Sequence, residues 1–447
     1  MYRYYAYSIL MIATVVFSAV VPAQTLRERA LKTLEKSLQA MADVHRHGGW
    51  AMEWSLDEKA VWGEFRPIAD DWITVQPPAT PTIAGTYLRA GKVLNETRWI
   101  DVARNAHTAL SRLQSVEGGL PHEGPPDDGP SKRGSFDDGT TTEALAFFLD
   151  MWHHTNAAED RAAVDRIGNF IVVSQMASSG GWPQSFPPPD TYGRYITFND
   201  GNFSNIMSSL KKLATETGDP KYHAAMMRGA ECILKLQGGD GEAIWAQQYD
   251  PETLEPAWAR RFEPPGYTPA ESVGVCNTLV ALYVETGDQR YVASLGRALD
   301  WYDTHKLENG KYARLYEPGT QRPVYGRRDK AEKVYDFANA CEGYGWQGDW
   351  YPTEAKKAYV AIQAQGGDAY RDEASRKVKH QVNAPAEKVI TGICDRLSDE
   401  GFWTRNPSSS QLEYYKEQGV SPEVPMVLVR DFNVHVNQLL NYIEGTK

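Results

Sequence analysis

Residues 279–310 read "LVALYVETGDQRYVASLGRALDWYDTHKLENG", and they show most clearly the unit from which the fold is built. Two apolar segments flank the polar turn "ETGDQRY", and Gly310 closes the stretch. In the second segment apolar side chains recur at helical spacing, as in Val292, Leu295 and Leu299. Because glycine commonly follows the last turn of a helix, the stretch predicts a helical hairpin that ends near Gly310.

The same pattern recurs along the first three quarters of the chain. Residues 87–120 and 210–241 each contain two apolar segments, a polar turn ("NETRW" or "ETGDPKY") and a glycine-bearing exit. The glycine exits fall at Gly49, Gly119, Gly181, Gly239 and Gly310. Alternating β-branched strands at regular spacing are not found. Repeated helical hairpins predict a mainly α fold, an incomplete (α/α) toroid.

Long irregular loops follow the second helix of each predicted hairpin. They span residues 118–137, 180–200, 240–271 and 310–340. Because each leaves the same end of a hairpin, we expect the loops to share one face of the toroid and to form a cleft there. The repeat fades after about residue 341, but no linker marks a boundary. We therefore expect a single domain over residues 24–447.

The N-terminal residues predict export. An apolar run from Ile9 to Val21 follows Arg3 and precedes small residues suited to cleavage. The run is short for a membrane span, so the pattern is typical of a signal peptide over residues 1–23, with an uncleaved anchor as the alternative. We expect a secreted or periplasmic protein whose mature chain, residues 24–447, has no membrane span.

Composition narrows the class of partner. The net charge of −11 argues against nucleic acid. The chain has 13 Trp and 24 Tyr, whose rings stack on sugars but also fill protein cores. Cys232, Cys276, Cys341 and Cys394 form no CxxC pair, which argues against structural zinc. Cys232 and Cys276 lie on apolar helical faces, so we expect these two to be buried free thiols. We also expect a monomer.

Two predicted loop–helix junctions carry acids and amides. "SFDDGTTTEALAF" places Asp137 and Asp138 before an apolar helical segment, and "ITFND" places Asn199 and Asp200 before the next one. Helix capping alone would explain these residue types. Alternatively, the two junctions share a hard cation such as calcium, which prefers several oxygen ligands.

Arginines interrupt two of the loops. "YARLYEPGTQRPVYGRRDK", residues 312–330, holds Arg314, Arg322, Arg327 and Arg328. "EPAWARRFEPP" holds Arg260 and Arg261. Such charges are usually solvated, but an arginine fork also pairs well with a carboxylate, which suits a uronic-acid chain.

Trp182 belongs to the stretch "GGWPQ", residues 180–184. The stretch is either a packed aromatic turn or a platform on which a sugar stacks. We expect Trp182 to contact substrate at the floor of the cleft.

The motifs "FDDGTTTE", "GGWPQ", "ITFND", "LEPAWARRFEPP" and "ARLYEPGTQRPVYGRRD" together resemble the family 10 polysaccharide lyases, which are pectate lyases. The resemblance follows the same order over residues 85–330 and weakens after Asp329. It implies calcium-assisted β-elimination on polygalacturonate, an acidic polysaccharide, with Ca²⁺ as the cofactor.

The resemblance also implies roles for individual residues. Asp137 and Asp200 match acidic positions at the calcium ion, and Asp138 stands beside them where asparagine is common. Arg260 and Arg314 match arginines that bind substrate carboxylates.

The catalytic base is an arginine in this family. Counting without a gap from the "AR" of "ARLYE" assigns the base to Arg328. Arg327 is the alternative base, and if Arg328 is the base we expect Arg327 to contact substrate. Arginine is ordinarily protonated in proteins, so the base role is an implication of the resemblance alone.

Two departures from the family leave other functions open. Ala340-Cys341 stands where the family usually carries a basic pair, and Pro318 follows the glutamate of "ARLYEP". A glycoside hydrolase that uses two loop carboxylates is the first alternative. A non-catalytic protein that captures oligouronides is the second.

Overall fold

A computed structural model of the chain describes residues 25–64, 66–376 and 384–446. The predicted signal peptide, residues 1–23, lies outside these ranges. Among the helices that the structure describes, none combines the length and the apolar character that a membrane span requires.

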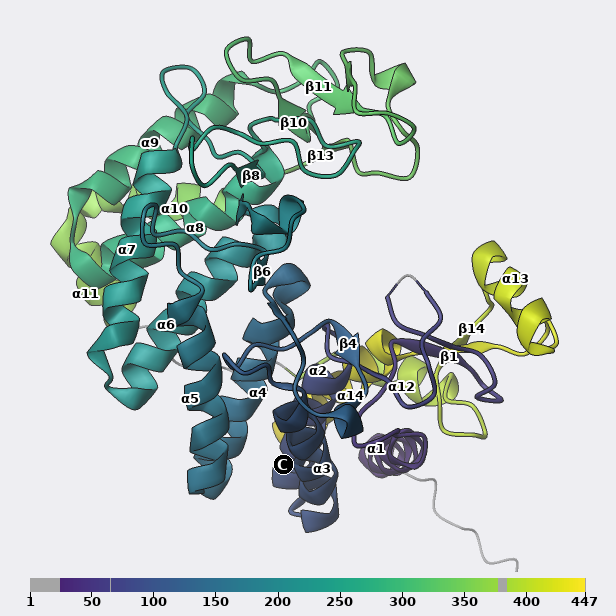
Figure 1. Cartoon of the computed structure of the whole chain (residues 1–447). Coiled ribbons are helices and arrows are strands. Elements are labelled where there is room, and N and C mark those ends of the chain that lie inside the picture. Colours follow the sequence, from purple (N-terminus) through teal and green to yellow (C-terminus); the bar gives the residue numbers. More distant parts are fainter. Residues whose placement is uncertain (1–24, 65, 377–383, 447) are drawn as a thin grey trace, which may run out of the picture.

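Helical hairpins form the body of the molecule. They pair α2 (Thr80–Leu94) with α3 (Thr97–Leu113), α4 (Thr140–Thr155) with α5 (Ala158–Val173), α6 (Asn202–Thr217) with α7 (Pro220–Leu236), and α8 (Pro269–Thr286) with α9 (Gln289–Thr304). The first helices of the hairpins pack side by side in one row, and α5, α7 and α9 pack in a second row. Figure 1 shows the hairpins following one another along an arc. The predicted mainly α, incomplete toroid is therefore confirmed.

Further helices extend the arc at both ends. At one end, α10 (Thr353–Gln365) and α11 (Gly367–Arg376) pack on α8. At the other end lie α1 (Leu26–Asp43), α12 (Glu387–Asp395) and α14 (Val429–Gly445), with α13 (Ser409–Gln418) further out (Figure 1). Arg89 of α2 donates to Asn437 at 2.9 Å and to Asn441 at 2.7 Å, which ties α14 to the first hairpin.

The shared "TGD" turn explains why these hairpins form. Gly218 and Gly287 end α6 and α8 in the left-handed region, with φ of 70° and 74°, which suits a residue without a side chain. The next residue caps the following helix, because the side chain of Asp219 accepts from the backbone N–H of Lys221 at 3.0 Å. Asp288 does the same at the start of α9.

Short antiparallel strands tie the loops together. One sheet has the order β14 (Thr404–Arg405), β15 (Met426–Leu428), β1 (Glu53–Ser55), β2 (Val61–Trp62), and another has the order β10 (Leu315–Tyr316), β11 (Pro323–Gly326), β12 (Lys333–Val334). The remaining pairs are β3 (Ile73–Thr74) with β4 (Glu123–Gly124), β5 (Gly134–Ser135) with β6 (Ser185–Phe186), β7 (Ile196–Thr197) with β8 (Gln248–Tyr249), and β9 (Tyr312–Ala313) with β13 (Gln347–Gly348). The pairs β5–β6 and β7–β8 each join the loop before one first-row helix to the loop before the next. Neighbouring loops therefore lie at the same end of the toroid, as predicted.

Trp182 is a core residue, and the prediction that it contacts substrate is wrong. Its side chain is 1% exposed, and its indole N–H donates to the carbonyl of Ile171 on the preceding helix at 2.8 Å. The ring also packs edge-on against Phe203, with centroids 5.2 Å apart. The backbone before it is tightly packed, since a Cβ on Gly180 would lie 2.4 Å from the carbonyl oxygen of Arg228.

The same indole bond recurs around the toroid, which gives Trp182 a structural explanation. Trp50 donates to Met41 and Trp245 donates to Ile233, both at 2.8 Å. In each case the bond pins the start of a loop to the helix that precedes it. The cleft loops are thus held on a rigid base.

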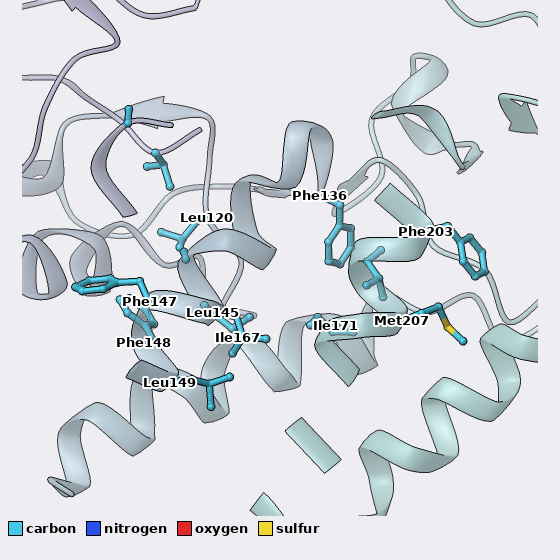
Figure 2. Packing of buried hydrophobic residues seen from close by; sticks show 14 of the residues in the cluster. Leu120, Phe136, Leu145, Phe147, Phe148, Leu149, Ile167, Ile171, Phe203 and Met207 are labelled. Atoms are coloured by element: carbon cyan, nitrogen blue, oxygen red, sulfur yellow. The ribbon is translucent and has the colours of Figure 1, made fainter. Parts of the chain in front are cut away.

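Buried phenylalanines anchor the two acidic junctions. Phe136 and Phe198 immediately precede the acidic residues and are 0% and 1% exposed. Phe136 packs on Phe170, and Phe198 stacks on Phe203. Figure 2 shows Phe136 among the buried side chains between α4 and α6. Cys232 and Cys276 are buried free thiols, as expected, and Cys341 and Cys394 are also free.

Candidate functional site

The two acidic junctions have the same backbone conformation. Asp138 has φ 49° and ψ 26°, and Asp200 has φ 51° and ψ 30°. The glycines that follow also agree, with φ of 72° at Gly139 and 71° at Gly201. Left-handed backbone is uncommon for residues other than glycine and is frequent at functional sites. α4 and α6 begin after these glycines without a side-chain cap, so helix capping does not explain the acids.

Asp137, Asp138 and Asp200, hereafter the acidic cluster, meet at this point. Each offers a carboxylate oxygen, and these atoms all lie within 4.8 Å of one another. Burial raises the pKa of Asp138 and of Asp200 to about 6, and the neighbouring carboxylates add to the effect. Three carboxylates at this spacing repel one another, so the arrangement favours a bound cation.

The donor set of the acidic cluster fits a hard cation. Among the side chains that the structure describes, Asp137 Oδ1 and the nearby Asn199 Oδ1 are buried oxygens without a hydrogen-bond partner. Buried acceptors are ordinarily satisfied, so unpaired oxygens beside a carboxylate cluster suit a metal such as Ca²⁺. Gln76 donates to the other side of the cluster, at 3.2 Å from Asp138 Oδ2.

The acidic cluster lies in a cleft of about 320 Å³, to which Asp137, Asp138 and Asp200 all contribute. Arg260 and Arg314 line the same cleft, so the predicted cation ligands and the predicted carboxylate-binding arginines come together. The other lining residues are Glu64, His122, Gln184, Tyr192, Asn199, Gln247, Gln248, Glu263 and Tyr344.

Arg260 is held by a buried carboxylate. Its Nε and Nη2 donate to Glu263 at 2.7 and 2.6 Å. Gln247 and Tyr344 donate to the same carboxylate at 2.9 and 2.7 Å. Burial opposes ionisation of Glu263, but Arg260 and these hydrogen bonds outweigh it and lower the pKa of Glu263. The Arg260 side chain stays 40% exposed and so remains accessible from the cleft.

Arg314 is more enclosed than Arg260. Its Nη2 donates to Glu271 at 3.1 Å, and its Nε is buried without a partner among the described residues. The guanidinium lies 4.9 Å from the ring centre of Tyr344 and 5.6 Å from that of Trp350. A charged donor that is buried and unpaired is costly, which suits a group that receives a ligand.

Arg327 and Arg328 have different surroundings. Arg327 forms a two-point ion pair with Asp329, with both distances 2.9 Å. The guanidinium of Arg328 lies 4.4 Å from the ring centre of Phe262, and Arg260 lies 5.0 Å from that same ring. Neither Arg327 nor Arg328 is among the residues that line the cleft, and Arg328 is linked to Arg260 of the cleft through their shared contact with Phe262.

Sequence reasoning missed several residues of the cleft. Glu64 is one of them, and burial raises its pKa to about 7, with the acidic cluster adding to the effect. His122, Gln184 and Gln247 were also missed, and they occupy one repeated position, the one that the predicted Arg314 takes in its own loop. Aligning "GLPH", "GWPQ", "IWAQ" and "KYAR" would have revealed that position.

Comparison with known proteins supports the resemblance seen in the motifs. A profile of the family described as "Pectic acid lyase" matches residues 125–313, a span that includes the acidic cluster and Arg260. A structure of a family 10 polysaccharide lyase from Cellvibrio cellulosa matches with a TM-score of 0.50 and 21% identity, covering 59% of this chain and 92% of that one.

A second solved structure, a mutant of the family 10 polysaccharide lyase from Cellvibrio cellulosa in complex with trigalacturonic acid, matches similarly. Its TM-score is 0.50 at 21% identity, with 63% of this chain and 98% of that chain covered. No curated protein sequence matches the chain. The resemblance to pectic acid lyases is therefore confirmed, and the likeness to the solved structures concerns the fold.

Proposed function

We propose that the chain is a secreted or periplasmic polysaccharide lyase that cleaves polygalacturonate, or a similar polyuronate, by calcium-assisted β-elimination. One observation carries the proposal: the acidic cluster shares its cleft with Arg260 and Arg314. A cation site next to fixed guanidinium groups suits a polymer that carries a carboxylate on every sugar. The net charge of −11 would repel such a polymer, and these local positive groups offset the repulsion.

Arg260 and Arg314 would bind uronate carboxylates. Glu263 takes Nε and Nη2 of Arg260, which leaves the N–H groups of Nη1 for a ligand. Glu271 takes Nη2 of Arg314, and the buried Nε is unpaired. The protein's own carboxylates thus orient both guanidinium groups without using all of their donors.

Asp137, Asp138 and Asp200 would hold the calcium ion, with Asn199 Oδ1 close by as a neutral oxygen. When bound, calcium would supply positive charge to the uronate carboxylate and so acidify the hydrogen on C5. The loop backbone places these carboxylates together, and a bound cation would offset the mutual repulsion that raises the pKa of Asp138 and Asp200.

Arg328 would remove the proton from C5 of the sugar. The electrons of the C–H bond form the C4–C5 double bond, and the C4–O bond breaks. The leaving oxygen takes up a proton from water, and Arg328 releases the C5 proton to solvent. Hydrogen bonds from Arg327 to Asp329 raise the pKa of Arg327 and stabilise its charged form. In the described part of the chain Arg328 has no carboxylate partner, and its guanidinium lies over the ring of Phe262, which Arg260 also contacts.

A glycoside hydrolase is the second candidate function, and Glu64 is the observation in its favour. An acid whose pKa is raised to about 7 resembles the proton donors of glycosidases. A hydrolase would release a reducing end without a double bond and would not need calcium.

The deciding experiment is incubation with polygalacturonate while ultraviolet absorbance from the new double bond is followed. We expect the absorbance to rise with calcium and to stay flat with a chelator. New reducing ends without absorbance would identify the hydrolase instead. Binding of oligouronides with neither product would identify a binding protein. Circular dichroism with and without chelator controls for loss of the fold.

A further inference from the structure

The sheet β10–β11–β12 and the turn that follows it expose aromatic side chains at the edge of the cleft loops. Phe337 is 53% exposed and Tyr335 is 43% exposed. Tyr335 follows β12 directly, and Phe337 lies two residues further on (Figure 1 labels β10 and β11 of this sheet). Single exposed apolar side chains are ordinary on protein surfaces, so exposure alone does not give Phe337 a role.

An aromatic run connects Phe337 to the cleft. The ring of Phe337 lies 5.6 Å from that of Tyr325, and Tyr325 lies 5.6 Å from Trp346. Trp346 lies 4.8 Å from Tyr344, which lines the cleft and lies under the guanidinium of Arg314. Tyr325 and Trp346 are each 3% exposed, so the middle of the run is packed core. Phe337 is the exposed outer end of this run.

Positive charge accompanies the run. Arg322 lies over the ring of Tyr335 at 4.4 Å, and Arg328 lies over Phe262 at the same distance. No carboxylate pairs with Arg322 or Arg328 within residues 25–64, 66–376 and 384–446. The other basic side chains nearby are neutralised, in the pairs Arg327–Asp329, Lys330–Glu332 and Lys333–Glu317.

The aromatic ring of Tyr335 is fixed in place. Its hydroxyl donates to Glu317 Oε1 at 2.7 Å, and Lys333 donates to the same oxygen at 2.8 Å. Arg322 is therefore held over a fixed ring while its N–H groups remain available. An exposed ring with an unpaired guanidinium beside it suits an anionic sugar better than an apolar protein surface.

We infer that Phe337, together with Tyr335 and Arg322, forms an outer subsite that binds a uronate residue of the polymer several sugar units away from the cleavage point. The inference rests on the proposed function, because the continuity of the aromatic run with the cleft identifies the occupant as the distal part of the same chain. Phe337 stacks on the face of the sugar ring, and Arg322 pairs with its carboxylate.

The test is a chain-length series of oligogalacturonides, from the dimer to the long polymer, with Phe337→Ala. We expect KM for the polymer to rise about three- to tenfold, as expected for the loss of one stacking contact, with the shortest cleaved substrate unaffected. Phe337→Trp should keep KM for the polymer at the wild-type value, because tryptophan can also stack on a sugar ring. Val360→Ala is the matched control, since Val360 is 55% exposed and lies on α10.

Several outcomes would overturn the inference. One is an equal effect at every chain length, which would place the role of Phe337 at the cleavage site or in the fold. Another is no effect at any length. A third is a wild-type dimer that becomes a monomer in Phe337→Ala, as measured by size-exclusion chromatography. That result would place Phe337 in an interface between two copies of the chain.

Failure of the proposed function is distinguishable from failure of the subsite. If the wild-type protein cleaves no polyuronate, the lyase proposal fails, and affinity electrophoresis in gels containing polygalacturonate still tests the subsite. We then expect Phe337→Ala to be retarded less than Val360→Ala. Equal retardation would overturn the subsite independently of catalysis.

Discussion

Arg314 donates from Nη2 to Oε1 of Glu271 at 3.1 Å, which joins the loop after α9 to the first turn of α8. Glu271 is 8% exposed. Burial raises its pKa to about 7, while Arg314 and the backbone N–H of Gly201 act in the opposite direction. Gly201 follows Asp200 directly, so Glu271 lies between the acidic cluster and the guanidinium that would bind substrate.

Glu271→Gln should therefore weaken substrate binding more than calcium binding. Glutamine keeps an acceptor but loses the charge that orients Arg314, and hydrogen bonds to charged groups contribute about 1.5–3 kcal/mol. We expect KM for polygalacturonate to rise roughly tenfold or more with little change in kcat. Steady-state kinetics and calcium titration of the same protein check this. A lower kcat at unchanged KM would contradict the positioning role.

Replacing one carboxylate of the acidic cluster should make activity depend on a higher calcium concentration. Asp200→Asn removes one charge while keeping an oxygen, so the apparent calcium affinity should fall by roughly ten- to a hundredfold. Activity measured against free calcium, together with calorimetric titration, gives the shift. Asp127→Asn is the matched control, because Asp127 pairs with His47 and Arg112 outside the cluster. Equal effects of the two variants would argue against a cation at the cluster.

Arg327 and Arg328 should differ strongly as alanine variants. Arg328→Ala should lower kcat by about 10²–10⁴-fold, the usual contribution of a general base, while binding of oligogalacturonide persists. Arg327→Ala breaks only an exposed pair with Asp329 and should change kcat less than about tenfold. Kinetics for turnover and equilibrium dialysis for binding separate the two effects. A dead Arg327 variant beside an active Arg328 variant would reverse the assignment.

Trp182 variants should lose stability and keep substrate affinity. Trp182→Phe leaves the carbonyl of Ile171 without its indole donor, which costs about 1–3 kcal/mol in a buried position. Trp182→Ala also opens a cavity and costs about 3–5 kcal/mol. Urea denaturation measures the loss, and KM is determined at a temperature where both variants are folded. An increase in KM for Trp182→Phe without loss of stability would restore the substrate role.

His107 should make the fold sensitive to mild acid. Burial lowers its pKa to about 4, against the opposing effect of Asp160, so the native protein holds the imidazole neutral. The unfolded chain, with a pKa of about 6.5, takes up the proton first as the pH falls. Above pH 6.5 the neutral His107 makes its full contribution to the free energy of unfolding. As the pH falls from 6.5 to about 4, that contribution decreases by roughly 3 kcal/mol.

Denaturation at a series of pH values, compared between the wild type and His107→Phe, isolates that contribution. We expect the two stability curves to converge as the pH falls from 6.5 toward 4. Asp160 titrates below this window, because its hydrogen bonds to Arg104 and Thr155 outweigh its burial and lower its pKa. Parallel curves across the window would show that His107 does not report on folding.

Local sequence patterns are enough to predict the hairpins and the face of the toroid on which the site lies. Apolar spacing and the "TGD" turns depend only on neighbours along the chain, so they predicted the helix pairs around Gly218 and Gly287. Repetition of one unit then required the loops to leave the same end. Asp138 and Asp200 occupy matching places in that unit, which is why the motif alone could bring them together.

Which side chains of those loops are available for chemistry depends on contacts that form only in the folded protein. Periodicity cannot tell a tryptophan that is hydrogen-bonded in the core from one that faces a sugar, and Trp182 was assigned to the wrong group. Two-residue strands such as β7 leave no pattern of alternation, because they exist only through pairing with another loop. Glu263 fixes the orientation of Arg260, and Glu271 fixes that of Arg314. Arg327 differs from its neighbour Arg328 because it forms an ion pair with Asp329. Burial and charge depend on every group within a few ångströms, and folding brings most of those groups from distant parts of the chain.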